Sequence, residues 1–200
     1  MTKDAKDLFA NQVFQHFLFN SLNSVASLCR TDPEAAAELV IEISAFLQKS
    51  LEKKPSLITL EEELEHVTSY INIQKTRFSN RLEIELHIEE PVDCLLPPCT
   101  LQPLIDNAVI HGVLKKRAGG MVLLSVQSTP YGIQFRVTDN GIGMNAGQLA
   151  LLLDSCNNIH SLFQIDCKLK ANGFKGLTIS SIKGQGTEVS FTIPSPVYPT

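Results

Sequence analysis

The sequence predicts an α+β fold, in which a helical hairpin is followed by a mixed β-sheet with helices layered on one of its faces. Two observations support this class. The N-terminal part carries two apolar stripes with helical spacing, and later segments alternate apolar and polar residues as half-buried strands do. The 200 residues, 44% hydrophobic and 19% charged, are enough for one or two compact domains.

Residues 4–30 predict one long helix, and a turn at residues 31–34 begins a second, because Asp32 can cap a helix and Pro33 is tolerated at its first position. His16 falls on the face opposite the apolar stripe of the first helix. Such a hairpin buries only part of its apolar surface, and the hairpin of a second copy would complete a four-helix bundle. The stripes are Phe14, Phe17, Leu18, Ser21, Leu22, Val25, Leu28 and Cys29, then Leu39, Val40, Ile43, Phe46, Leu47, Ser50 and Leu51.

The sheet and its helices follow a linker at residues 53–56. Thr59 and Glu62 have the spacing of a capping box at the start of a helix that runs to about Phe78. Leu82, Ile84, Leu86 and Ile88 alternate with polar residues as a strand with one wet face. The remaining expected elements are a helix at 100–114, strands at 121–128 and 133–138, helices at 145–153 and 158–171, strands at 176–182 and 187–193, and a tail at 195–200.

The composition excludes some partners and locations. A net charge of −4 and a pI near 5.7 leave no basic footprint for nucleic acid. No apolar run reaches the roughly 18 residues of a membrane span, and residues 1–7 lack the apolar centre of a signal peptide. We therefore expect no nucleic-acid partner, no membrane contact within this chain and a cytoplasmic location. The chain would be a stand-alone protein or the cytoplasmic part of a membrane-anchored one.

The five cysteines are scattered, which fits reduced thiols in a cytoplasm. Cys94 and Cys99, taken with His87 and His111, match no zinc spacing, so we expect buried structural thiols.

Residues 139–143, Asp-Asn-Gly-Ile-Gly, directly follow the strand at 133–138. Gly141 and Gly143 allow the backbone to approach a flat or charged ligand and to adopt positive φ. A carboxylate beside this turn, that of Asp139, could accept a hydrogen bond from an amine of the ligand. The alternative is an ordinary turn, because Asp-Asn-Gly is also common in turns.

The helix at 100–114 carries several polar residues within about one turn among apolar neighbours. Asn107 offers a neutral oxygen suited to Mg²⁺, and Asp106 could hold a water or accept a proton. Ile110 and His111 lie in the same turn. A polar helix edge that faces solvent is the alternative interpretation.

Four stretches, taken in order, resemble the LytS/YehU-type sensor histidine kinases: residues 15–23, 70–78, 97–112 and 139–143. The resemblance covers nearly the whole chain. It implies a dimerisation and phosphoacceptor hairpin at residues 1–54 and an ATP-binding domain of the gyrase, Hsp90, histidine kinase and MutL (GHKL, or Bergerat) type at residues 55–194. Residues 195–200 would be a tail.

The resemblance also implies roles for single residues. His16 would be the phosphoacceptor, Asn107 the Mg²⁺ ligand, and Asp139 the acceptor for the adenine amino group of ATP. Asp106 would act in catalysis, and the other nucleotide-binding residues would be His111, Gly141, Gly143 and Thr187. Gly184 and Gly186 fit the Gly-x-Gly-Thr pattern of the family or a hairpin turn. Arg77 would reach the phosphates or the hairpin, or lie at a solvated helix end.

The implied function is ATP-dependent autophosphorylation of His16, followed by phosphoryl transfer to an aspartate on the receiver domain of a response regulator, within a homodimer. A neutral imidazole nitrogen is a competent nucleophile near pH 7. The alternatives are a non-catalytic dimeric scaffold that binds partners, and an ATPase without a phosphoacceptor.

The sequence departs from the family pattern in four respects. Gln15 stands where the family usually has Pro, and Asp106 where it has Glu. Residues 159–162, Ile-His-Ser-Leu, stand in place of the Gly-x-Gly-Leu lid, which favours the scaffold alternative. The chain also has no sensor part.

Overall fold

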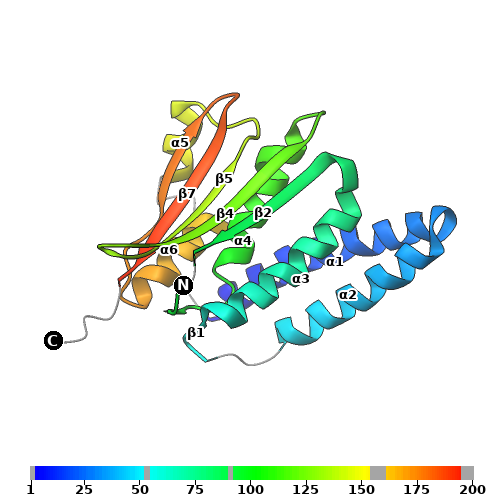
Figure 1. Ribbon diagram of the computed structural model, residues 1–200, viewed down its shortest axis with the longest axis horizontal. Helices are drawn as coiled ribbons and strands as arrows, with labels where there is room; N and C mark the ends of the chain where they lie inside the picture. Colours follow the sequence, from blue (N-terminus) through cyan, green and yellow to red (C-terminus); the bar gives the residue numbers. More distant parts are fainter. Residues whose placement is uncertain (1–2, 52–54, 90–91, 154–160, 195–200) are drawn as a thin grey trace.

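A computed structural model of the chain describes residues 3–51, 55–89, 92–153 and 161–194 (Figure 1). For residues 3–16, Leu51, Ser79 and Leu153 it describes the backbone alone. No described helix is both long enough and apolar enough to cross a membrane.

The N-terminal hairpin consists of α1 (Lys3–Thr31) and α2 (Pro33–Leu51). The turn between them is closed by Asp32, whose carboxylate accepts a hydrogen bond of 3.1 Å from the backbone N–H of Ala35. Both predicted helices and the predicted position of Pro33 are confirmed. In Figure 1 the two helices lie antiparallel, beside the third long helix of the chain, α3 (Leu60–Phe78).

The apolar stripes of the hairpin are only partly buried. Phe17, Ser21, Leu39, Ile43 and Phe46 are buried. Other members of the stripes are exposed, with Leu22 at 48%, Val40 at 45% and Cys29 exposed as well. This agrees with the expectation that the hairpin alone buries only part of its apolar surface. The physical reason is that both helices turn one edge of their stripe toward α3, which leaves the other edge uncovered.

The start of α3 has the predicted capping box. The hydroxyl of Thr59 accepts the backbone N–H of Glu62 at 3.2 Å, and the carboxylate of Glu62 accepts the backbone N–H of Thr59 at 2.9 Å. Just before it, β1 (Ile58–Thr59) pairs with β3 (Leu95–Leu96), a two-residue ribbon that the sequence did not predict. The short 3₁₀ turn η1 (Ser79–Arg81) follows α3.

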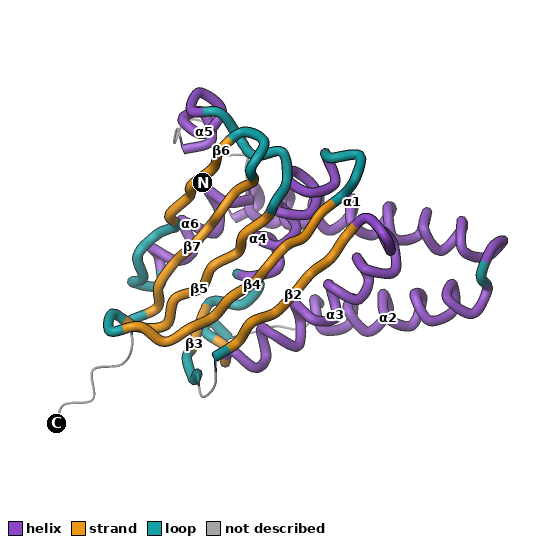
Figure 2. The backbone as a smooth tube through the Cα atoms, turned by 45° about the horizontal axis from the view of Figure 1, so that its top comes forward, coloured by secondary structure: helices purple, strands orange, loops and turns teal. Residues whose placement is uncertain are grey.

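The sheet has five strands in the order β2-β4-β5-β7-β6, and Figure 2 shows them side by side, with the helices on one face. Only the pair β2·β4 is parallel. Residues alternate between a buried face and a polar outer face, where Arg136 and Glu188 form an ion pair of 3.6 Å. The bounds are β2 (Leu82–Ile88), β4 (Gly120–Thr129), β5 (Gly132–Asp139), β6 (Thr178–Ile182) and β7 (Gly186–Ile193).

The predicted helix at 100–114 is one helical segment with three geometries. It begins as α4 (Leu101–Asn107), widens to the π-helical turn η2 (Ala108–Gly112) and tightens to the 3₁₀ turn η3 (Val113–Lys115). Such π turns are rare and often mark functional sites. The two later helices, α5 (Ala146–Leu153) and α6 (Ser161–Ala171), confirm the predicted pair, and the predicted first residues of the second helix, 158–160, lie outside the described ranges.

One hydrophobic core joins the hairpin to the helices and the sheet. The ring of Phe17 lies 5.6 Å from that of Tyr70, and the ring of Phe46 stacks on His66 at 4.8 Å. The hairpin therefore packs directly on α3, which in turn covers the sheet. The predicted division of the chain after residue 54 remains a prediction, since residues 52–54 lie outside the described ranges.

Candidate functional site

Asp139 ends the central strand β5 and is 5% exposed. Its Oδ1 accepts the backbone N–H of Gly141 at 2.7 Å. Burial raises the pKa of Asp139 above its ordinary value, while hydrogen bonds from the backbone of Gly141 and Thr187 and the charge of Lys116 oppose that rise. The carboxylate is thus directed into the protein beside the glycine turn.

The glycine turn after Asp139 is held between the π turn and the hairpin of β6 and β7. A Cβ on Gly141 would lie 2.2 Å from the carbonyl carbon of Gly112, and Gly143, at φ +57°, would meet the carbonyl oxygen of Ile182 at 2.0 Å. On the other side, the backbone N–H of Gly184 donates to the carbonyl of Ile142 at 2.6 Å. Glycine is therefore required at both positions by backbone contact.

Thr187 lies directly opposite Asp139 in the pairing of β5 with β7. Its hydroxyl lies 2.9 Å from that of Ser181, which also donates to the carbonyl of Gly186 at 3.0 Å. Gly184 and Gly186 have φ of +83° and +116° at the turn of this hairpin, which confirms the hairpin interpretation of these glycines. The predicted residues Asp139, Gly141 and Thr187 are thus neighbours.

Asp106 and Asn107 end α4, immediately before the π turn that leads to Gly112. The side-chain nitrogen of Asn107 donates to the carbonyl of Pro103 at 2.7 Å and to the hydroxyl of Ser161, the first residue of α6. Both bonds use nitrogen, so the amide oxygen is the atom suited to a hard cation such as Mg²⁺. His111, in the π turn, is exposed.

Asp106 accepts a hydrogen bond from the hydroxyl of Tyr70 on α3. Tyr70 also accepts a hydrogen bond of 2.5 Å from Gln74, whose side-chain oxygen accepts one of 3.0 Å from Arg77. Arg77 is half-buried near the end of α3 and its bond is to Gln74, one turn earlier on the same helix, so its reach to the phosphates or the hairpin stays a prediction. Tyr70 and Gln74 were not predicted as site residues from the sequence, although polar residues recur along this face of α3 with helical spacing.

Two predicted features lie partly outside the described residues. His16 belongs to α1, one residue before the buried Phe17, but its side chain is not described. Of the lid stretch, Ile159 and His160 are not described. Leu162 is buried in α6 and packs in the core, as do Ile165 and Leu169.

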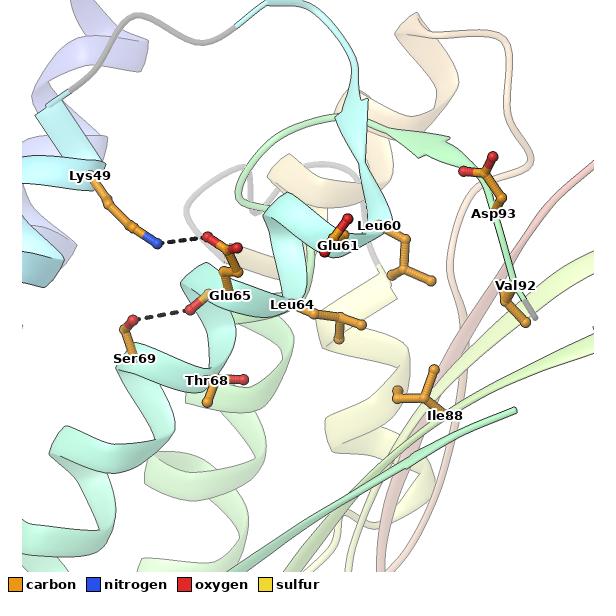
Figure 3. Close-up of a pocket in the computed structure, with 10 residues that line it drawn as sticks. All are labelled: Lys49, Leu60, Glu61, Leu64, Glu65, Thr68, Ser69, Ile88, Val92 and Asp93. Atoms are coloured by element: carbon orange, nitrogen blue, oxygen red, sulfur yellow. Dashed lines mark hydrogen bonds and ion pairs between the residues drawn. The ribbon is translucent and has the colours of Figure 1, made fainter. Parts of the chain in front are cut away.

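A groove of about 750 Å³ lies along the junction of α2, α3 and β2 (Figure 3). Leu60, Leu64 and Ile88 form part of its apolar lining. At its rim, Lys49 of α2 and Glu65 of α3 form an ion pair of 2.8 Å. The groove shares no residue with the site around Asp139.

The sequence matches known kinases over most of its length. The family model of histidine kinases matches residues 6–82. YwpD of Bacillus subtilis is 38% identical, in an alignment that covers 92% of this chain and 67% of YwpD. The sensor protein LytS of Bacillus cereus is 34% identical, over 93% of this chain and 33% of LytS. The chain belongs to the LytS-type family of sensor histidine kinases.

Solved structures agree with this family in fold. A bacterial phosphotransferase superposes with a TM-score of 0.61 at 11% identity, covering 95% of this chain and 97% of that one. The histidine kinase domain of the blue-light activated kinase of Erythrobacter litoralis EL346 superposes with a TM-score of 0.52 at 19% identity, over 86% and 87%. The predicted α+β class, a helical hairpin followed by a GHKL-type sandwich, is confirmed.

The LytS-type relatives are mostly longer than this chain. The chain spans about one third of LytS and of the sensor histidine kinase YpdA of Escherichia coli, which is 30% identical over 92% of this chain. The shared region therefore corresponds to the hairpin and sheet described above.

Proposed function

We propose that this LytS-type chain is an ATP-dependent histidine kinase that phosphorylates His16 and then passes the phosphoryl group to an aspartate on the receiver domain of a response regulator. The observation that carries the proposal is the position of Asp139. A buried carboxylate at the end of the central strand, fixed by Gly141 and facing Gly112, is suited to accept the amino group of an adenine.

The residues around Asp139 fit a nucleotide. Thr187 lies opposite it across β5 and β7. Gly141 and Gly143 pack against the backbone of Gly112 and Ile182, which holds the turn in place beside Asp139. The side chain between them, that of Ile142, is 41% exposed. His111 is exposed in the π turn that leads from Asn107 to Gly112. We assign Asp139, Gly141, Gly143, Thr187 and His111 to nucleotide binding.

Asn107 and Asp106 support the phosphoryl-transfer chemistry. The Asn107 amide oxygen would hold Mg²⁺, which when bound neutralises phosphate charge and usually keeps most of its ligands from water and phosphate. Asp106, the preceding residue, would orient a water or accept a proton. In the transfer itself, an imidazole nitrogen of His16 forms a bond to the γ-phosphorus while the bond to the β–γ bridging oxygen breaks, and ADP leaves with the electron pair.

The hairpin supports the proposal of a homodimer. Phe19, Leu22, Val40 and Ile41 are large apolar residues that are between 45% and 69% exposed on α1 and α2. Surface of this kind marks an interaction site, and a second hairpin would bury it in a four-helix bundle. We accordingly assign residues 1–54 to dimerisation and phosphate acceptance, 55–194 to ATP binding, and 195–200 to a tail.

Incubation with γ-labelled ATP and Mg²⁺ tests the proposal. We expect acid-labile label on the wild type and none on His16→Ala, while both proteins bind ATP equally. Asp139→Asn should lose label together with ATP binding. No label and no nucleotide binding by the wild type would instead support the scaffold, and ATP turnover without label would support a simple ATPase.

A further inference from the structure

The inner face of α3 carries a stripe of polar residues at helical spacing. The first member, Glu63, is fully buried, and its carboxylate accepts the backbone N–H groups of Cys99, Thr100 and Leu101 at 2.7–2.8 Å. His66 Nε2 lies 3.0 Å from the side-chain oxygen of Gln102. The stripe continues through Tyr70, Gln74 and Arg77. α3 is therefore joined to α4 and the residues just before it by contacts of Glu63, His66 and Tyr70.

The C-terminal half of the stripe is a directed chain of hydrogen bonds. Arg77 donates to Gln74, Gln74 donates to Tyr70, and Tyr70 donates to Asp106. Burial, together with the charge of Asp106, raises the pKa of Tyr70 well above its ordinary value, so the hydroxyl keeps its proton. Because every donor points the same way, each bond reinforces the next, and the chain fixes one oxygen of Asp106.

The ring of Tyr70 also contacts the hairpin. It lies 5.6 Å from the ring of Phe17 on α1 and 6.2 Å from that of Phe46 on α2, and these two rings are 5.0 Å apart. Phe17 follows His16 in the chain. Because Tyr70 is fully buried, a shift of either hairpin helix must move its ring.

Two further contacts join the hairpin to α3. The ring of Phe46 stacks on His66 at 4.8 Å, and His66 in turn lies 3.0 Å from Gln102 of α4. The ion pair of Lys49 with Glu65 lies at the rim of the groove in Figure 3, and the two side chains are 44% and 59% exposed. Exposed pairs of this kind contribute little to stability. The buried aromatic contacts of Tyr70 and His66 are therefore the stronger connection between the hairpin and α3, and the one through Tyr70 leads on to Asp106.

We propose that Tyr70 is a positioning residue for Asp106. Through the contacts of its ring with Phe17 and Phe46, the orientation of Asp106 depends on the position of the α1–α2 hairpin relative to α3. The inference rests on the proposed kinase function. A regulatory signal that moves the hairpin would then change the orientation of Asp106 beside Asn107 without any direct contact with the nucleotide.

Tyr70→Phe tests the positioning role, because it keeps the ring and its packing and removes only the hydroxyl. We expect the rate of autophosphorylation at saturating ATP to fall by about 10- to 100-fold, as misplacement of a reacting group does, with the KM for ATP changed less than twofold. Asn72→Ala, on the exposed face of the same helix, is the matched control and should keep the wild-type rate.

A double variant separates positioning from general packing. In an Asp106→Asn background, Tyr70→Phe should change the remaining rate less than twofold, because the group through which it acts is gone. Phe46→Leu should lower the autophosphorylation rate severalfold in the wild-type background. In the Tyr70→Phe background it should lower the rate much less, because the hydroxyl that connects the ring to Asp106 is absent. Circular dichroism of each variant monitors folding.

The outcomes are distinct. The inference would be overturned if Tyr70→Phe phosphorylated itself at the wild-type rate. It would also be overturned if Tyr70→Phe slowed Asp106→Asn by the same factor as it slows the wild type. Either result would leave the kinase proposal unaffected. Absence of label on the wild type would overturn both. The inference is supported if Tyr70→Phe lowers the rate at saturating ATP in the wild-type background but has no such effect in the Asp106→Asn background.

Discussion

Gly112 lies against the carboxylate of Asp139, so closely that a Cβ at residue 112 would be 2.6 Å from Oδ1 and 2.7 Å from Cγ. The two residues come from different elements, the π turn η2 and the strand β5. The backbone of Gly112, at φ −94°, is open to other residues, so the contact itself requires glycine. This contact joins the helical segment of Asn107 to the strand of Asp139.

Gly112→Ala should therefore destabilise the protein. We expect the free energy of unfolding to fall by roughly 1–3 kcal/mol, the usual cost of overpacking, and ATP binding to weaken as Asp139 is displaced. Urea unfolding and calorimetric titration with ATP measure the two effects. Gly147→Ala is the matched control. Its Cβ would meet nothing closer than 3.4 Å, and alanine should stabilise this helical position by about 0.5–1 kcal/mol. Equal stability of the two variants would contradict the prediction.

Asp139→Asn should raise the stability of the ligand-free protein near pH 7 while weakening ATP binding. Burial raises the folded-state pKa of Asp139 above the ordinary 3.8, so its contribution to stability is fully present below that value and is lost as pH rises through the folded pKa. Asparagine does not ionise and can still accept the N–H of Gly141. The stability difference between variant and wild type should therefore be larger at pH 7 than at pH 4. Thermal unfolding at both pH values measures this. If the stability difference between Asp139→Asn and the wild type were the same at pH 4 and pH 7, the explanation would be wrong.

Glu63→Gln should destabilise the junction of α3 and α4. The buried carboxylate accepts three backbone N–H groups, and an amide would turn a donor toward some of them. We expect a loss of roughly 2–3 kcal/mol in the free energy of unfolding. Glu61→Gln, at an exposed position two residues earlier, should change it by less than about 0.5 kcal/mol. Urea denaturation of both variants measures this difference. Similar midpoints would show that the bonds of the Glu63 carboxylate to the three backbone N–H groups do not stabilise the junction.

Cys94 should resist alkylation in the folded protein. It is buried, and burial with the charge of Asp93 raises its pKa to about 11, so little thiolate is present at pH 8. Cys29 and Cys167 are exposed and should react with iodoacetamide first. Mass spectrometry of peptides after timed labelling measures the order, and unfolding in urea should abolish it. Fast labelling of Cys94 without urea would contradict its position in the core.

Local signals in the sequence predicted much of the fold. Thr59 and Glu62 are three residues apart, so their capping box can be inferred from spacing alone, and the alternation before Asp139 places this carboxylate at a strand end. The bond between Tyr70 and Asp106 joins residues 36 positions apart, and no local pattern specifies such a pair. The π turn after Asn107, which contacts β5, was also missed, because the helical period of the sequence does not distinguish it from an α-helical turn.

The exposed apolar face of the hairpin leads to a final prediction, about assembly. Ile41 is 69% and Phe19 67% exposed, and a second copy of the hairpin would remove such side chains from water. Ile41→Glu would place a charge in that interface, where an unpaired charge is costly. We expect the wild type to be a dimer and the variant a monomer of unchanged circular dichroism, as measured by light scattering after size-exclusion chromatography. Tyr131→Glu, at an 85% exposed position in the turn between β4 and β5, should remain dimeric and so shows that the effect belongs to the hairpin. A wild type that is monomeric at high concentration would mean that this face has another partner.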